Sequence, residues 1–272
     1  MSKNQKRFNK ILKDIKSVRI QGARNIAKGA LNAYLLAPGK KSKKQLLLSR
    51  PTEPMMENVL DLAEKGYPKN KIIVHFKDSQ EKINKSVLRI IKNNNTILTH
   101  CHSTNVVNAL IYAKKKGKKF QIYNTETRPL FQGRKTALEL RNAKIKVTMF
   151  VDSALNIILS QKGLEKINKI FLGADALTKK GIINKIGSGL IADIAKEHKI
   201  PVYIIADSWK FTKKKIPIEQ RKLNEIWDRA PKGIKIKNPA FEFVEKKYIK
   251  AIITEFGIKR YSNFVKIAEK YN

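Results

Sequence analysis

The chain begins with stretches in which apolar residues recur at helical spacing. Between residues 6 and 18 the apolar positions are three or four apart and would share one helix face: Phe8, Ile11, Leu12, Ile15 and Val18. Similar spacing predicts helices over residues 23–36 and 57–65, with a lysine-rich link at 38–44 between them. The first 90 residues are therefore predicted to form a small helical domain.

From residue 96 the pattern changes to short β-rich runs that alternate with helical stretches. The predicted strands cover residues 96–99, 120–124, 146–151, 169–172, 202–206 and 249–254. The predicted helices lie between them, at residues 105–116, 134–143, 153–161 and 187–198. Such alternation is typical of repeated βαβ units and a largely parallel sheet. The predicted fold class is therefore α/β, with a helical domain over residues 1–90 and a parallel-sheet domain over residues 91–272.

Residues able to do chemistry follow these predicted strands. They are His100, Cys101, His102 and Ser103 after the first strand, Glu126, Thr127 and Arg128 after the second, Asp152 and Ser153 after the third, Asp175 after the fourth and Asp207 after the fifth. Ligands of an open parallel sheet bind beyond the carboxyl ends of its strands. The sequence therefore predicts an active site for a phosphate ester at this edge.

Cys101 and Asp175 are the candidates for acid–base chemistry. A lone cysteine is commonly an inert core residue, but Cys101 precedes a predicted helix, whose N–H groups and dipole are expected to lower the thiol pKa. Asp175 could be a helix cap or a surface acid. Because an apolar run at 170–172 leads into it, we expect burial to raise its pKa. A thiolate opposite a protonated acid suits the isomerisation of a sugar phosphate.

Phosphate binding has its own candidates, since arginine forks and helix N-termini are good anion donors. They are the Gly22–Ala23 turn, Arg50, Ser103 with the amides after it, Arg128, Lys185 and Lys210. The sequence holds neither GxGxxG nor GxxxxGK[ST], so nicotinamide and P-loop chemistry lose support. His100 and His102 are two apart at a strand end, where they would point to opposite sides. They are interpreted as hydrogen-bonded structural residues, and no metal is expected.

Composition limits the classes of protein to which the chain could belong. The chain has 272 residues, 42% of them hydrophobic, which predicts a folded protein, and 58 Lys plus Arg against 22 Asp plus Glu give a net charge of +36. A basic N-terminal arm for nucleic acid is one interpretation, but the helical spacing favours a docked helix with lysines on its solvated face. With Cys101 as its one cysteine and no apolar run of roughly 18–20 residues, the chain is expected to be cytoplasmic, neither exported nor membrane-inserted.

Nine motifs carry a resemblance to a known family. They are SRPTEP at 49–54, THCHS at 99–103, TETRPLFQGRKTALEL at 125–140, VDSA at 151–154, GADAL at 173–177, INKIG at 183–187, ADSWKF at 206–211, NPAFE at 238–242 and IITEFGI at 252–258. Together they resemble the archaeal ribose-1,5-bisphosphate isomerases. That family shares a superfamily with methylthioribose-1-phosphate isomerases and the alpha, beta and delta regulatory subunits of eukaryotic translation initiation factor 2B. The resemblance implies a helical N-terminal domain, a Rossmann-like C-terminal domain and a hexamer built as a trimer of dimers.

The resemblance also implies a reaction, the conversion of α-D-ribose 1,5-bisphosphate to ribulose 1,5-bisphosphate during AMP degradation that feeds an archaeal RuBisCO. By motif position Cys101 matches the proton acceptor and Asp175 the proton donor. The matching substrate-binding positions are Gln21, Gly22, Ala23, Arg24, Arg50, Ser103, Thr104, Asn105, Asn184, Lys185 and Lys210. The family implies no metal or redox cofactor, and AMP as an activator.

Three departures from the family pattern keep alternatives open. Gln21 stands where the family usually has an arginine, the N-terminal domain is shorter, and the segment 175–184 is one residue shorter. One alternative is a non-catalytic protein resembling the regulatory subunits and binding initiation factor 2. Another is an isomerase of a different pentose phosphate, such as methylthioribose 1-phosphate. The cysteine of THCHS favours the enzyme over the regulatory subunit.

Overall fold

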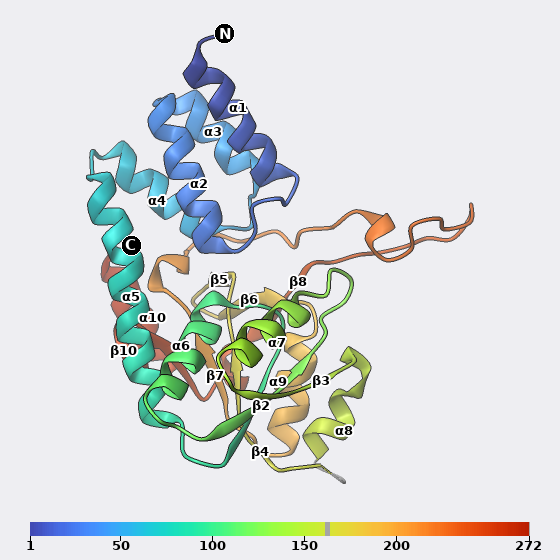
Figure 1. The fold of residues 1–272 in the computed structure, drawn as a ribbon. Helices are drawn as coiled ribbons and strands as arrows, with labels where there is room; N and C mark the ends of the chain where they lie inside the picture. Colours follow the sequence, from blue (N-terminus) through green and yellow to red (C-terminus); the bar gives the residue numbers. More distant parts are fainter. Residues whose placement is uncertain (161–163, 272) are drawn as a thin grey trace.

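Four helices form the upper part of the molecule in Figure 1, a computed structural model that describes residues 1–160 and 164–271. They are α1 (Lys3–Lys16), α2 (Ala23–Leu36), α3 (Lys40–Ser49) and α4 (Pro54–Glu64). Phe8 and Ile15 of α1 are fully buried in one cluster with Ile26, Leu46 and Met56. The first helix is therefore docked on a core, as its spacing predicts.

The prediction of a lysine-rich link at 38–44 is wrong. Residues from Lys40 onward begin α3, which buries Leu46 and leaves most of its lysines in solvent. Lysine has good helix propensity, so a lysine run can form the solvated first turns of a helix whose later residues are apolar.

The long helix α5 (Lys69–Ile90) was not predicted, and it touches both parts of the molecule. Ile72 and Phe76 near its start pack with side chains of α2 and α4, whereas Ile83 and Val87 pack with the core under α6. Its buried residues are separated by many lysines and polar residues, which weakens the apolar stripe. The domain division at residues 90 and 91 stays a prediction.

A seven-stranded sheet forms the lower part, in the order β10-β9-β7-β4-β1-β2-β3 (Figure 1). Its strands are β1 (Asn95–Thr99), β2 (Phe120–Thr125), β3 (Lys146–Phe150), β4 (Ile167–Leu172), β7 (Val202–Ile205), β9 (Ala251–Thr254) and β10 (Gly257–Lys259). Each described neighbouring pair is parallel except β9 with β10. The predicted α/β class with a largely parallel sheet is confirmed.

Helices cover both faces of this sheet. They are α6 (Thr104–Lys115), α7 (Gln132–Asn142), α8 (Leu155–Ser160), α9 (Ser188–Glu197) and α10 (Tyr261–Tyr271). One apolar cluster joins α8, α9 and α10 to the strands, and a second joins α5 and α6 to the opposite strand faces. The predicted strand at 249–254 starts at Ala251, because the short helix η4 (Lys246–Tyr248) precedes it. Residue 161 of the predicted helix 153–161 lies outside the described residues.

A second, antiparallel sheet was not predicted. It consists of β5 (Ala176–Leu177), β6 (Gly181–Lys185) and β8 (Phe241–Glu245). Residues 212–240 between η2 (Ser208–Lys210) and β8 form an arm that reaches away from the body and contains η3 (Leu223–Glu225) (Figure 1).

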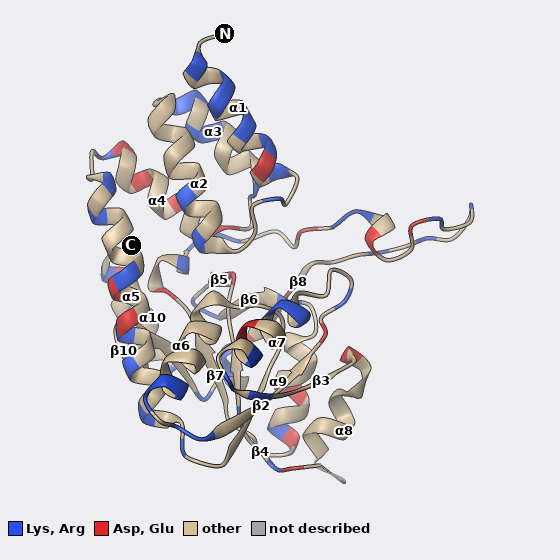
Figure 2. Cartoon of the chain, viewed as in Figure 1, with Lys and Arg blue, Asp and Glu red and all other residues tan. Residues whose placement is uncertain are grey.

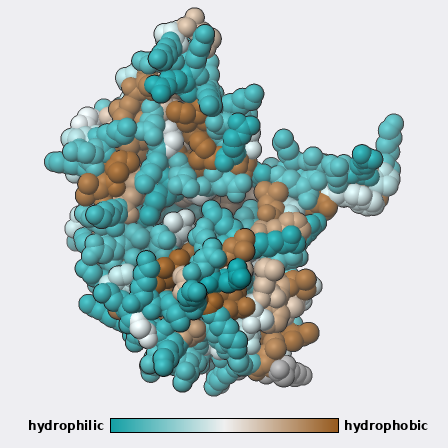
Figure 3. Space-filling model, in the orientation of Figure 1, coloured by the Kyte–Doolittle hydropathy of each residue, from teal (hydrophilic) through white to brown (hydrophobic). Residues whose placement is uncertain are grey.

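Basic residues are spread over both parts of the molecule (Figure 2), and hydrophilic side chains cover most of the face in Figure 3. Among the described helices, none has the length and apolarity needed to cross a membrane.

Candidate active site

Cys101 lies in a tight turn between β1 and α6. Its φ of 65° is left-handed, which is uncommon for a residue with a side chain. The turn is held by two hydrogen bonds: the Cys101 N–H donates to Thr127 Oγ1 at 2.9 Å, and Thr136 Oγ1 donates to the Cys101 carbonyl at 2.8 Å. Strained backbone of this kind persists where surrounding contacts determine it, and it gathers at functional sites.

The Cys101 thiol is protonated in the free site. Burial raises its pKa to about 11; the nearby charge of Lys185 opposes this, and that of Asp175 adds to it. The expected low pKa is therefore wrong. The helix dipole does not compensate, because α6 begins three residues later, with Ser103 as its N-cap accepting from the Val106 N–H.

Asp175 follows β4 and starts the small antiparallel sheet. Gly173 lets the end of β4 approach Ser103, since a Cβ at Gly173 would lie 2.6 Å from Ser103 Oγ. The Asp175 N–H donates to the Ile183 carbonyl at 2.8 Å. Burial raises the pKa of Asp175, as predicted, while Lys210 and Lys185 act in the opposite direction. Lys210 is itself held by donating from Nζ to the Ala174 carbonyl.

One cavity brings together the catalytic and substrate-binding residues that the family resemblance implies. It lies between the helical part and the carboxyl ends of the strands, and its lining includes Gln21, Gly22, Ala23, Arg24, Arg50, Cys101, Ser103, Thr104, Asn105, Asp175, Asn184, Lys185 and Lys210. Arg128 is not brought to it: this exposed guanidinium lies 4.9 Å from the centre of the Phe131 ring and donates to the Ile226 carbonyl. The catalytic and binding roles of the lining residues stay predictions.

The N-termini of α2 and α6 and several cationic side chains line this cavity, a combination that suits anions. The N-cap Gly22 of α2 has a φ of 82° and no side-chain cap, which leaves the first N–H groups of α2 for other acceptors. Gln80 of α5 links this end to α6, because its Oε1 accepts from Arg24 at 3.1 Å and from Asn105 at 3.0 Å. Lys185 and Lys210 lie on the far side, next to Asp175.

Several lining residues were missed by the sequence reasoning. They are Glu53, Leu130, Gln132, Lys135, Glu219, Arg221 and Phe241. Glu53 and Gln132 each carry a buried side-chain oxygen with no hydrogen-bond partner. Both lie inside quoted motifs, so the motifs could have pointed to them. Glu219 and Arg221 belong to the arm, and no local signal brings the arm to the cavity.

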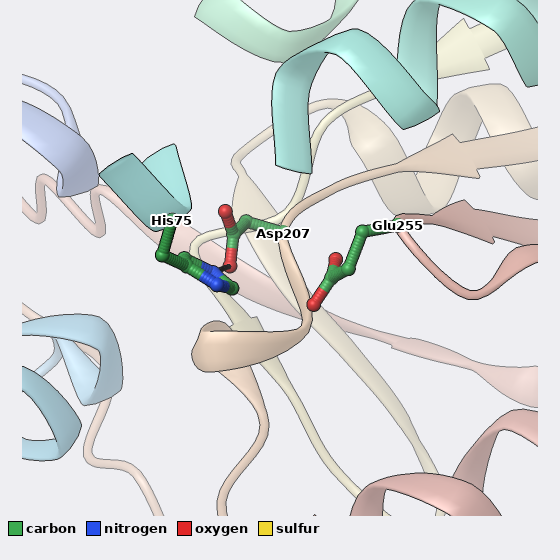
Figure 4. A group of neighbouring side chains, drawn as sticks. All are labelled: His75, Asp207 and Glu255. Atoms are coloured by element: carbon green, nitrogen blue, oxygen red, sulfur yellow. Dashed lines mark hydrogen bonds and ion pairs between the residues drawn. The ribbon is translucent and has the colours of Figure 1, made fainter. Parts of the chain in front are cut away.

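His75, Asp207 and Glu255 form a second polar cluster, where α5 meets the ends of β7 and β9 (Figure 4). Within residues 1–160 and 164–271 it is the one group whose donor atoms, all within 4.8 Å of one another, have a composition that could hold a metal ion. Most of its polar atoms have partners: Asp207 Oδ1 faces His75 Nε2 at 3.2 Å and accepts from the Trp209 N–H, and Glu255 accepts from Ser208 and Ser79, while Asp207 Oδ2 has no partner among the described residues. We interpret the cluster as a link between α5 and the sheet.

The two histidines near Cys101 are hydrogen-bonded. His100 faces Thr125 Oγ1 at 2.5 Å and the Ile186 carbonyl at 2.8 Å, and His102 faces Thr136 Oγ1 at 3.1 Å. Burial lowers the pKa of both rings, that of His102 to about 4, so both are neutral near pH 7. Their interpretation as structural residues agrees with these contacts.

A parallel α/β fold with a thiol, a raised carboxyl pKa and several cations in one cavity defines an enzyme suited to acid–base chemistry on an anionic small molecule. A family model described as the Initiation factor 2 subunit family matches residues 40–260, and the chain belongs to this family. The ribose 1,5-bisphosphate isomerase of Methanocaldococcus jannaschii is 35% identical, with 94% of this chain and 92% of that protein aligned. The methylthioribose-1-phosphate isomerase of Thermosipho africanus is 30% identical over 93% of this chain and 86% of that protein.

The fold also matches solved structures. A crystal structure described as the translation initiation factor eIF-2B of Pyrococcus horikoshii OT3 superposes with a TM-score of 0.82 at 24% identity, covering 93% of this chain and 97% of that one. The resemblance stated from the motifs and the predicted enzyme class, an isomerase, are therefore confirmed.

Proposed function

We propose that this protein converts α-D-ribose 1,5-bisphosphate to ribulose 1,5-bisphosphate. The observation that carries the proposal is the cavity in which Cys101 and Asp175 lie together with cationic side chains that include Arg24, Arg50, Lys185 and Lys210. The relative from M. jannaschii with this activity in its name supports the choice of substrate. The charged lining also favours a second phosphate over the thioether of methylthioribose 1-phosphate, which needs an apolar pocket.

The two residues divide the proton transfers. Asp175, whose raised pKa keeps a proton available, donates it to the ring oxygen as the bond from C1 to that oxygen breaks. Cys101, once its thiol has released its proton to water, takes the proton from C2 as a thiolate, which leaves a C1–C2 enol. Asp175, now a carboxylate, accepts the proton of the C2 hydroxyl, and Cys101 returns its proton to C1. The C2 carbonyl is formed, and both residues regain their starting states.

Lys185 favours the thiolate form of Cys101, which is the form that accepts the proton from C2. The Cys101 thiol must lose its proton before it can accept one, and the charge of Lys185 opposes the rise of the thiol pKa. The charge of Lys185 also opposes the rise of the Asp175 pKa. The phosphates lie among the cations and the helix N-termini of α2 and α6.

Phosphorus NMR of the purified protein with ribose 1,5-bisphosphate tests the proposal. The wild type should form ribulose 1,5-bisphosphate, and Cys101→Ser and Asp175→Asn should each lower turnover by about 10²–10⁴-fold with the fold intact by circular dichroism. Near-normal turnover by either variant would overturn the assignment of that residue. Conversion of methylthioribose 1-phosphate in preference to the bisphosphate would instead move the substrate to that compound.

The remaining expectations belong to the same proposal. They are a cytoplasmic hexamer, AMP as an activator, no metal or redox cofactor, and a place in AMP degradation before an archaeal RuBisCO. Adding AMP to the same assay tests activation.

The alternative is a regulatory protein that binds initiation factor 2, and the family description favours it as the second candidate. Capture of that factor that persists at high salt, by a protein that does not turn over the bisphosphate, would support this alternative. Capture that fades with salt reflects the charge of +36.

A further inference from the structure

Glu53 is the most deeply buried acid of the cavity that the proton transfers do not use. It stands at the start of α4 and lines the cavity, yet 3% of its surface is exposed. Its Oε1 accepts from Arg50 Nη2 at 3.1 Å. Its Oε2 is buried and has no hydrogen-bond partner within residues 1–160 and 164–271. A buried carboxyl oxygen without a partner is costly, which indicates a partner that arrives with a ligand.

Arg50, which contacts Glu53, has a hydrogen-bond donor that is unpaired in the described part of the chain. Arg50 is 7% exposed, its Nη2 faces both Glu53 Oε1 and Glu219 Oε2, and its Nε–H is buried without an acceptor. The joined pair therefore has one unused acceptor and one unused donor, and both of its residues line the same cavity. A hydroxyl group matches both, because its oxygen accepts from an N–H while its proton goes to a carboxyl oxygen.

The charges around Glu53 favour a neutral partner as well. Burial and the charge of Asp175 raise the pKa of Glu53 to about 8, and Arg50 and Lys210 act against this rise. A hydroxyl can donate to the carboxylate and accept from the carboxylic acid, so it fits either protonation state. A phosphate dianion would be repelled by the carboxylate and by the adjacent Glu219.

We propose that Glu53 is a specificity-determining residue that binds the 3-hydroxyl of the sugar through Oε2. This inference rests on the proposed function, because the furanose of ribose 1,5-bisphosphate has two hydroxyls and the reaction consumes the one at C2. The 3-hydroxyl is the one left for a binding contact. A site built to bind a hydroxyl rejects the analogue that lacks it, since the buried oxygen then stays without a partner.

The experiment compares kcat/KM for ribose 1,5-bisphosphate and its 3-deoxy analogue in the wild type, Glu53→Ala and Glu53→Asp. The wild type should prefer the natural substrate by about 100-fold, and the preference should shrink to about threefold or less in Glu53→Ala. Glu53→Asp keeps a carboxyl but withdraws it by one methylene, so it should also lose most of the preference. Glu57→Gln, a change on the same helix with an exposed Lys214 partner, is the matched control and should keep it.

Each outcome separates the two hypotheses. If the wild type does not convert the bisphosphate, the proposed function fails. If the wild type converts both compounds equally well, or if both Glu53 variants keep the wild-type preference, the role of Glu53 is overturned while the proposed function stands. Should Glu53→Ala fail to fold in a thermal scan, Glu53→Asp decides the question alone.

Discussion

At the scale of single residues, the chemistry of the site depends on the raised pKa values of Cys101 and Asp175. The chemistry needs a sulfur that can take a proton, yet burial keeps the Cys101 thiol neutral at pH 7, and Lys185 is the nearby cation that works against this. The carboxyl of Asp175 is shifted in the same upward direction, so it too favours its neutral form. The thiol of the free site therefore keeps its proton, and deprotonation of Cys101 becomes a step that pH can limit.

Alkylation of Cys101 reports this directly, because it is the one cysteine of the chain. A thiol with a pKa of about 11 is ionised more completely as pH rises, so its reaction with iodoacetamide should accelerate about tenfold per pH unit between pH 7 and 9. Lys185→Met should slow the reaction at each pH, whereas Lys180→Met, an exposed change nearby, should not. Cys101→Ser gives the blank. A rate that levels off near pH 7 would contradict the raised pKa.

Gln132 offers a second test at this scale. Gln132 lines the cavity at the start of α7, and its Oε1 is buried with no partner in the part of the chain that the structure describes. If a substrate donor meets this oxygen, Gln132→Ala should lower kcat/KM by about 10–100-fold with little change in stability. Gln45→Ala, an exposed change on α3, is the control and should leave kcat/KM unaltered. An unchanged kcat/KM in Gln132→Ala would remove this residue from the binding site.

The position of Cys101 could be predicted from the sequence, but its environment could not. A β-rich run followed by a helical stretch predicts the crossing from strand to helix, and that crossing exists. The pKa depends on burial by segments far along the chain, including Asp175 and Lys185. Such burial has no local signal, which is why the dipole argument gave the wrong sign.

At the scale of elements, the seven-stranded sheet could be predicted from the sequence, whereas the small antiparallel sheet could not. The central strands β1 and β4 are buried along nearly their whole length and contain the apolar runs 97–98 and 170–172, which the sequence shows directly. Strand β5 pairs with β6, and β6 pairs with β8, about sixty residues later, through segments of two to five residues. Their pairing depends on the remote partner more than on local propensity, so the small sheet that positions Asn184 and Lys185 was missed.

Helix α1 allows an element-scale test of whether the basic N-terminus is a packed helix. Phe8 is fully buried in the cluster shared by α1, α2, α3 and α4. Phe8→Ala should lower the free energy of unfolding by about 3–5 kcal/mol, measured by urea denaturation with circular dichroism. Lys10→Ala, exposed on the same helix, should change it by about 0.5 kcal/mol or less. Equal stability of the two variants would mean that α1 is not docked in solution.

At the scale of the whole molecule, the arm of residues 212–240 has more apolar surface than a solvated loop needs. Leu223, Trp227 and Ile234 are each about half exposed, on a segment that reaches away from the body (Figure 1). Clusters of exposed large apolar residues commonly mark a protein contact. In the proposed hexamer a second copy of the chain would cover them, and the arm would couple assembly to the cavity through Glu219 and Arg221.

The molecular mass of the assembly, measured together with KM, tests whether the arm couples assembly to the cavity. Trp227→Asp should reduce the molecular mass measured by light scattering after size exclusion, because a charge replaces the exposed ring. Lys232→Asp, exposed on the same arm, should keep the wild-type mass. Since Glu219 of the arm holds Arg50 at 3.4 Å, loss of assembly should also raise KM for the bisphosphate. A Trp227→Asp protein with wild-type mass would exclude the arm from the assembly contact, and lost assembly with unchanged KM would show that the cavity is complete within one chain.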